Sequence, residues 1–129
     1  MADPDPEAAA VLAAYEAFAR GDIGQAVAGL HPQVEWIEPE EFPYGGRRVG
    51  PDAVADYLRR SRSMWAELVS EPTAHRRGDH IVVVHHVHGH LADGTFRDTT
   101  VADVFTFRDG VVVRMQAYAD PAQAFAACS

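Results

Sequence analysis

The chain has 129 residues, of which 47% are apolar, and its 19 acidic and 11 basic residues give a formal net charge of −8. This length and composition predict one domain with a single core, which excludes collagen-like, low-complexity and disordered classes. The acidic excess argues against nucleic acid as a partner, because contacts to phosphate need a basic surface.

The sequence contains no apolar run of about 18 residues, the length that a membrane-spanning helix needs, so we expect no membrane partner. Residues 1–6 are acidic and lack the basic start of a signal peptide, and we expect them to form a flexible N-terminus. The single cysteine, Cys128, excludes an internal disulfide and a cysteine-rich zinc site. These features favour a cytoplasmic protein.

The first predicted elements are helices. Apolar residues recur at helical spacing over 7–20, and Gly21 ends that helix. Asp22 opens a short second helix, which His31-Pro32 breaks.

A strand and a third helix follow. Residues 33–37 alternate between apolar and polar side chains, which predicts a strand. Residues 38–50 are rich in proline and glycine and predict a long loop of the kind that often binds ligands. Pro51 suits the first position of the third helix.

The second half of the chain alternates between strand and turn patterns. Glycine-containing turns separate four predicted strands, which are residues 68–76, 81–91, 97–108 and 111–118. A short alanine-rich helix or a frayed end follows from Pro121. Helices followed by an antiparallel meander indicate the α+β class. We expect a curved sheet around the N-terminal helices, with an internal pocket.

Five short motifs resemble the NTF2-like superfamily, and within it the SnoaL-like group that includes ketosteroid isomerase and polyketide cyclases. They are Tyr15 to Asp22, Leu30 to Trp36, Gly50 to Val54, Asp103 to Gly110 and Tyr118 to Asp120. The resemblance implies that residues 1–129 form a single SnoaL-like domain, an NTF2-like cone, that acts without a cofactor. It also implies a sheet-mediated homodimer. The superfamily hosts several reactions and non-enzymes, so function does not follow from the fold.

Two carboxyl groups are the first catalytic candidates. Asp103 shares a strand face with Phe105 and Phe107, where an ionised carboxylate is costly unless it is paired or protonated. The resemblance implies that this aspartic acid donates a hydrogen bond to an oxyanion; the alternative is a buried ion pair. Glu38, before Pro39, resembles the general base of ketosteroid isomerase, with a solvated loop glutamate as the alternative.

The resemblance also implies a catalytic tyrosine on the first helix. Counting back from Gly21, that position falls on Ala14, so Tyr15 is expected to be rotated away by about 100°. Tyr15 is then either an ordinary core residue or part of the substrate site.

Histidines are concentrated between residues 75 and 90. His86, His88 and His90 share one strand face, and His85 shares the other with Ile81, Val83 and Val87. By resemblance the 86/88/90 face lines the pocket, which predicts a catalytic pair of His86 or His88 with Asp103.

Two alternatives stay open for these histidines: a polar face at a subunit contact, and a metal site. Three positions on one strand rarely converge on one ion without a further ligand, so we expect no metal.

The last catalytic candidate is Asp120, which is an acid/base residue by resemblance to polyketide cyclases or else the N-cap of a C-terminal helix. Aromatic and sulfur-containing side chains are expected to line the substrate site or the core, with Phe42 and Tyr44 as lid residues. The others are Trp36, Tyr57, Trp65, Phe105, Met115 and Tyr118.

The sequence thus predicts a cofactor-independent isomerase, cyclase or dehydratase for an apolar carbonyl-bearing small molecule, such as a polyketide, terpenoid or steroid-like ring. The alternative is a non-catalytic ligand-binding or dimeric interaction module of the same fold. The two differ in whether at least two titratable groups converge inside the pocket.

Overall fold

A computed structural model describes residues 5–128 of the chain. The helices are α1 (Pro6–Ala19), α2 (Ile23–Ala26), α3 (Pro51–Ser63) and α4 (Pro121–Ala126). The strands are β1 (Leu30–Glu38), β2 (Gly46–Val49), β3 (Trp65–Arg77), β4 (His80–Leu91), β5 (Phe96–Arg108) and β6 (Val111–Tyr118). Residues 1–4 of the expected flexible N-terminus lie outside the described residues, whereas Asp5 and Pro6 form the start of α1.

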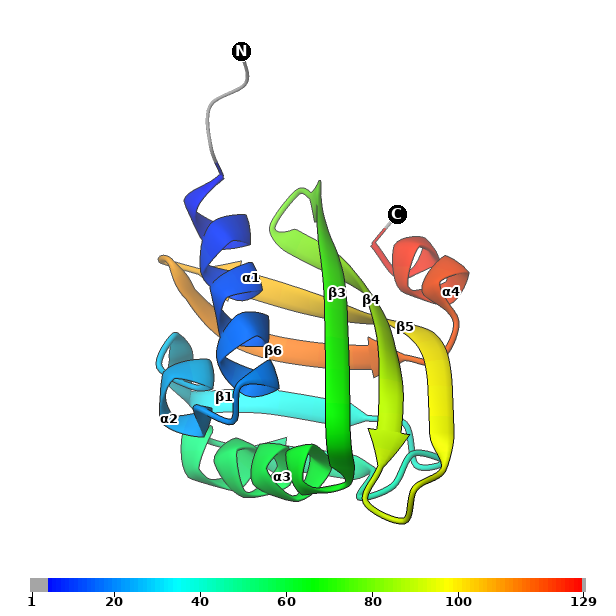
Figure 1. The fold of residues 1–129 in the computed structure, drawn as a ribbon. Coiled ribbons are helices and arrows are strands. Elements are labelled where there is room, and N and C mark those ends of the chain that lie inside the picture. The colour runs from blue at the N-terminus through cyan, green and yellow to red at the C-terminus, as the bar shows by residue number, and fades with distance from the viewer. Residues whose placement is uncertain (1–4, 129) are drawn as a thin grey trace.

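All six strands form one sheet in the order β2-β1-β6-β5-β4-β3. Neighbouring strands are antiparallel except β1 and β6, which run parallel. Figure 1 shows β5 bending along its length, so that β3 and β4 turn away from β1 and β6 and the sheet forms an unclosed, cone-like half-barrel. The α+β class and the expected curved sheet are confirmed.

Helices α1, α2 and α3 cover the concave side of the sheet (Figure 1). The carboxylate of Asp5 accepts hydrogen bonds from the backbone N–H groups of Glu7 and Ala8, which satisfies the free donors at the start of α1. Val11 and Tyr15 of α1 and Val54 of α3 then pack on the concave core. The sheet contributes the rest of this core, with Val34, Trp36, Ile81, Val83, Phe105 and Met115 among its members.

Helix α4 covers part of the opposite, convex face. Ala124 packs there on Val82, Ala102 and Val104, whose side chains point away from the concave core. Both faces of β4 and β5 are thus buried near α4, whereas the convex face further along β4 carries histidines. These histidines therefore lie beyond the part of the convex face that α4 covers.

The structure differs from the sequence prediction at the first strand, in the loop after it and at the start of β3, which begins at Trp65 and not at residue 68. Strand β1 already begins at Leu30, so the second helix stops at Ala26, and Pro32 lies within the strand. Leu30 pairs with Val112 of β6, and tertiary pairing outweighs the local signal of the proline. The expected loop 38–50 contains β2, which pairs with the second half of β1.

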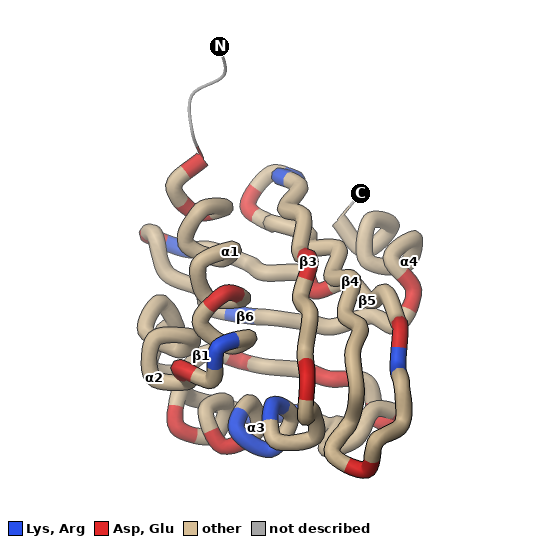
Figure 2. Tube along the Cα trace, in the orientation of Figure 1, with Lys and Arg blue, Asp and Glu red and all other residues tan. Residues whose placement is uncertain are grey.

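Charged residues are distributed over the whole fold. Figure 2 shows basic positions at the end of α3, and acidic positions on β3, at the β4–β5 turn and at the start of α4. Among the described residues, no helix combines the length and the apolar character that crossing a bilayer requires.

Gly89 allows β3 and β4 to approach closely, at the point where the pairing of these strands shifts between Trp65 and Glu67. Its φ is +142°, and a Cβ at this position would lie 2.1 Å from the carbonyl oxygen of Glu67. We therefore expect Gly89→Ala to lower the free energy of unfolding by about 2 kcal/mol or more.

Urea denaturation followed by circular dichroism measures this change. Gly29→Ala is the matched control, because an added Cβ there meets no atom within 4 Å. An equal effect of the two substitutions would contradict the steric explanation.

Candidate active site

The concave side of the sheet and the three N-terminal helices enclose a cavity of about 680 Å³. This volume lies within the range of small-molecule sites. Its wall is largely apolar and combines aliphatic residues with the aromatic side chains of Tyr15, Phe18, Trp36, Phe42, Tyr57, Trp65, Phe105 and Phe107. Two carboxyl groups, Asp103 and Glu38, also line the cavity, and Tyr15, Trp36 and Tyr57 hydrogen-bond with them.

Asp103 projects from the middle of β5 into this cavity. It pairs across the sheet with Val83 and shares its face with Phe105 and Phe107, as the strand period predicts. The hydroxyl of Tyr15 on α1 donates a hydrogen bond to Oδ2 of Asp103. Asp103 lies deep in the molecule and remains open to the cavity, so a ligand there meets its carboxyl group.

Glu38, the last residue of β1, is the second carboxyl group of the cavity and is almost fully buried. Nε1 of Trp36 donates to Oε1 of Glu38 over 3.0 Å. Tyr57 of α3 also hydrogen-bonds with Glu38, and the guanidinium of Arg48 lies 4.6 Å from the centre of the Tyr57 ring. Two donors and one nearby cation therefore support a negative charge on Glu38.

Burial raises the pKa of both carboxyl groups, because the protein replaces the water that would stabilise their charges. The charge of Asp103 raises the pKa of Glu38 further. The hydrogen bond from Tyr15 opposes the effect of burial on Asp103. Two carboxyls that interact in this way titrate as a pair, and near neutral pH the pair retains a proton. One site thus offers both a proton donor and a proton acceptor.

His85 is a third titratable group on the cavity wall. Its ring meets the ring of Tyr15 edge-on at 4.7 Å, and its Nε2 lies 2.6 Å from the hydroxyl of Ser70. Burial lowers the pKa of His85 to about 4, so the imidazole is neutral at pH 7. His85 therefore contributes a neutral polar edge beside the Tyr15–Asp103 pair.

The predicted pairing of His86 or His88 with Asp103 is corrected by the strand register. Cross-strand partners in an antiparallel sheet point to the same face, and Asp103 pairs with Val83. The cavity face of β4 therefore holds Val83, His85 and Val87, while His86 and His88 point from the convex face and do not line the cavity. The signal for His85 was present in the sequence, since it alternates with these apolar residues.

The expectation that Tyr15 points away from the catalytic position is also wrong, because its hydroxyl group reaches Asp103. Of the aromatic side chains predicted for the substrate site, Tyr15, Trp36, Phe42, Tyr57, Trp65 and Phe105 line the cavity.

The remaining predicted site residues lie elsewhere. Met115 is fully buried in the core, and Tyr44 is exposed on the loop before β2. Tyr118 packs with α4 against the convex core. Asp120 caps α4 by accepting a hydrogen bond from the backbone N–H of Ala122, as its alternative interpretation predicted. These four side chains do not meet the two carboxyls.

Comparison with known proteins gives one family match. The profile of the SnoaL-like domain matches residues 11–115, which span most of the chain and include both carboxyls. No curated protein matches the chain significantly.

Several solved structures share the fold over nearly their whole length. TerC, co-crystallised with polyporic acid, is 28% identical, with 96% of this chain and 98% of that chain covered and a TM-score of 0.77. An NTF2-like protein from Burkholderia pseudomallei is 26% identical, with 95% and 97% covered and a TM-score of 0.80. A putative polyketide cyclase from Xanthomonas campestris is 27% identical, with 95% and 96% covered and a TM-score of 0.70.

The raised pKa of Glu38 has a consequence for stability. When the pKa of a carboxyl is higher in the folded than in the unfolded state, folding becomes less favourable as the pH rises from the lower to the higher of these two values. Glu38→Gln removes this loss and keeps an acceptor for the Trp36 N–H. We expect the variant to gain about 1 kcal/mol or more over the wild type at pH 8, and clearly less at pH 5.

Urea denaturation at the two pH values measures the difference. Glu40→Gln, on the exposed loop, is the matched control and should change stability equally at both. A Glu38→Gln effect that does not grow with pH would show that Glu38 is ionised at its ordinary pKa.

Proposed function

The chain belongs to the SnoaL-like domain family, and from this premise we propose that it is a cofactor-independent acid/base enzyme. Its substrate is an apolar, carbonyl-bearing small molecule such as a polyketide, terpenoid or steroid-like ring. The observation that carries the proposal is the convergence of Glu38 and Asp103 on one apolar cavity, where they form a coupled pair. A binding module needs only the cavity, whereas proton transfer needs such a pair.

Glu38 is the proposed proton acceptor. The N–H of Trp36, the hydroxyl of Tyr57 and the charge of Arg48 favour its ionised form. In the reactive form Glu38 carries the charge and takes a proton from the carbon next to the substrate carbonyl. Water is largely excluded around this carboxylate, so its basicity is higher than in solvent.

Asp103 and Tyr15 are proposed to stabilise the enolate that this transfer creates. The higher pKa of Glu38 places the proton of the pair mainly on Glu38 in the free protein. In the reactive form this shared proton resides on Asp103 instead. Tyr15 donates to Oδ2 of Asp103, and the carboxylic acid in turn donates to the enolate oxygen. Such a chain strengthens each of its hydrogen bonds in a site of low dielectric. Return of the proton to another carbon, ring closure or loss of a leaving group would complete an isomerisation, cyclisation or dehydration.

The wall of the cavity supports the proposed substrate class. Aromatic rings surround the two carboxyls, and cationic side chains are few among the described lining residues, where Arg97 is exposed at the edge of the sheet. The similarity to TerC, crystallised with polyporic acid, and to a putative polyketide cyclase agrees with a ring-containing substrate. We also propose that the protein is a single-domain, cytoplasmic homodimer, as the sequence analysis expects; light scattering of the purified protein tests the dimer.

Ligand binding tests the enolate site. Planar phenols imitate an enolate, and Trp36 and Trp65 on the cavity wall report binding by fluorescence. We expect micromolar binding of phenols and of polyporic acid, and a loss of about tenfold or more in Asp103→Asn, because the amide is a much weaker donor than the acid. Asp93→Asn on the exposed β4–β5 turn is the control and should bind as the wild type does. Absence of binding by the wild type would reject the enolate site.

Hydrogen exchange tests proton transfer itself. A cyclic ketone that binds in the cavity should exchange its α-hydrogens for deuterium in D₂O, as followed by NMR. We expect Glu38→Gln to slow this exchange by about 10²-fold or more while the ketone still binds. Binding without exchange in the wild type would support the non-catalytic module instead.

A further inference from the structure

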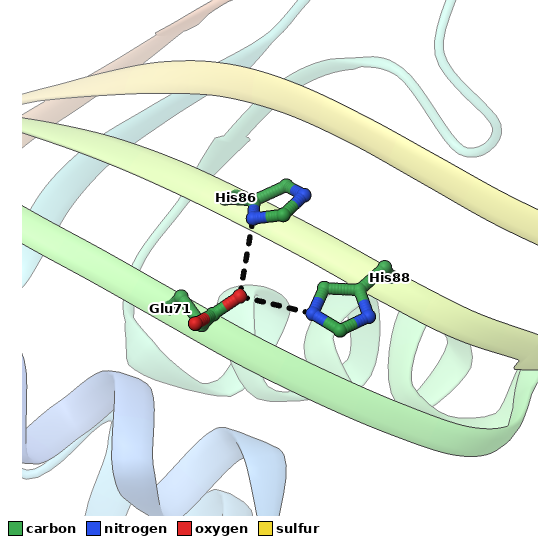
Figure 3. Close-up of side chains that lie close together, drawn as sticks. All are labelled: Glu71, His86 and His88. Atoms are coloured by element: carbon green, nitrogen blue, oxygen red, sulfur yellow. Dashed lines mark hydrogen bonds and ion pairs between the residues drawn. The ribbon is translucent and has the colours of Figure 1, made fainter.

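The convex face of the sheet carries a second cluster of titratable side chains, Glu71 of β3 with His86 and His88 of β4 (Figure 3). Oε1 of Glu71 lies 3.1 Å from Nδ1 of His86 and 2.9 Å from Nε2 of His88. The two imidazole rings stack with their centres 4.8 Å apart. One carboxylate oxygen thus faces one nitrogen from each of two imidazoles.

Strand geometry holds the three side chains together. His86 and His88 are two residues apart on β4 and therefore share a face. Glu71 is the direct cross-strand partner of His86, so its carboxylate reaches both rings. Helix α4 covers Val82 on the same face and leaves the cluster accessible, with 39% of the His86 and 29% of the His88 side chain exposed. An ion from solvent has a path to the three ligand atoms.

Asp98 of β5 adds an independent observation. Its Oδ1 lies 2.7 Å from Nε2 of His86, the ring nitrogen that does not face Glu71. Histidines that bind metal ions commonly donate their other N–H to a carboxylate, which fixes the tautomer and the ring orientation. Asp98 therefore leaves Nδ1 of His86 as the nitrogen available to an ion.

We infer that Glu71, His86 and His88 form a binding site for a divalent transition-metal ion such as Zn²⁺. Two imidazoles and a carboxylate are ligands that this class of ion prefers. Around a tetrahedral zinc ion, ligand atoms lie about 3.4 Å from one another, given zinc–ligand distances of about 2.1 Å. The three atoms here all lie within 4.8 Å of one another, so small side-chain rotations close the site.

A bound ion would replace the existing contacts between the carboxylate of Glu71 and the two imidazole rings. In the structure one ring nitrogen of each histidine faces Oε1 of Glu71. When the ion binds, it takes the place between these atoms and the ring nitrogens act as lone-pair donors. Three protein ligands leave a fourth position for water or another donor.

The three ligand residues do not line the cavity, whereas Asp98, which contacts His86, does. The cluster lies on the convex face, whereas Asp103 and His85 point from the concave face of the same two strands. From the sequence alone we expect no metal, because the histidines share one strand. The further ligand comes from Glu71 on the neighbouring strand. The inference does not depend on the proposed acid/base function.

Zinc titration of the full chain, purified without a histidine tag, tests the site by competition with a chromogenic chelator. We expect one Zn²⁺ per chain at low micromolar affinity. Glu71→Gln and His88→Gln each remove one ligand and should weaken binding at least tenfold, while Asp98→Asn should weaken it by about 10-fold to 100-fold through the orientation of His86. Circular dichroism of each variant confirms that it is folded.

His90→Gln is the matched control. His90 lies on the same strand face and also contacts a glutamate, Glu67, outside the cluster, so its loss should leave zinc affinity unchanged. A wild type that binds Zn²⁺ more weakly than about 100 µM would overturn the inference. So would equal losses in His90→Gln and His88→Gln, which would indicate scattered histidine binding. As a second readout, Co²⁺ should give visible absorption of a tetrahedral site in the wild type and lose it in Glu71→Gln.

Discussion

The constraint on which the site depends is the burial of two carboxyl groups in one apolar cavity. Either group alone would lose the hydration of its charge, and together they also repel each other when both are ionised. The protein supports each with its own donors, Tyr15 for Asp103 and Trp36 with Tyr57 for Glu38. The result is a coupled pair that retains a proton near neutral pH. A group that accepts a proton and a group that donates one then coexist in the same site.

The fold produces this arrangement from distant parts of the chain. Glu38 ends β1 and Asp103 lies mid-way along β5, and the single strand β6 separates them in the sheet. Both carboxyls face the cavity on the concave side of the curved sheet. Helices α1 and α3, which cover that side (Figure 1), supply Tyr15 and Tyr57. The opposite face of the same strands is divided between the apolar contact with α4 and the exposed Glu71–His86–His88 cluster. One sheet therefore carries two chemically different surfaces whose residues alternate along β4 and β5.

Sequence patterns predicted the elements better than the contacts between them. The α+β class, the curved sheet and the strand from 111 to 118 followed from periodicity and turn residues, and Asp103 was correctly placed on an apolar face. The error over His86 and His88 concerned only which face of β4 turns inward. A turn centred on Asp93 pairs odd-numbered residues with odd-numbered ones, which already puts His85 on the same face of the sheet as Asp103. Tyr15 was misjudged because the position of a helix about its axis depends on packing, and Glu71 was missed because cross-strand neighbours lie far apart in sequence.

Carbon-13 NMR of labelled aspartate and glutamate side chains measures the shared proton of the carboxyl pair directly. Between about pH 6 and pH 8, the interval between the two raised pKa values, we expect the wild type to keep one of these two carboxyls protonated. We also expect Asp103→Asn to lower the pKa of Glu38, because the neighbouring charge is removed. Two fully ionised carboxylates at pH 7, or a pKa of Glu38 that is indifferent to Asp103, would contradict the coupled pair and with it the proposed chemistry of the cavity.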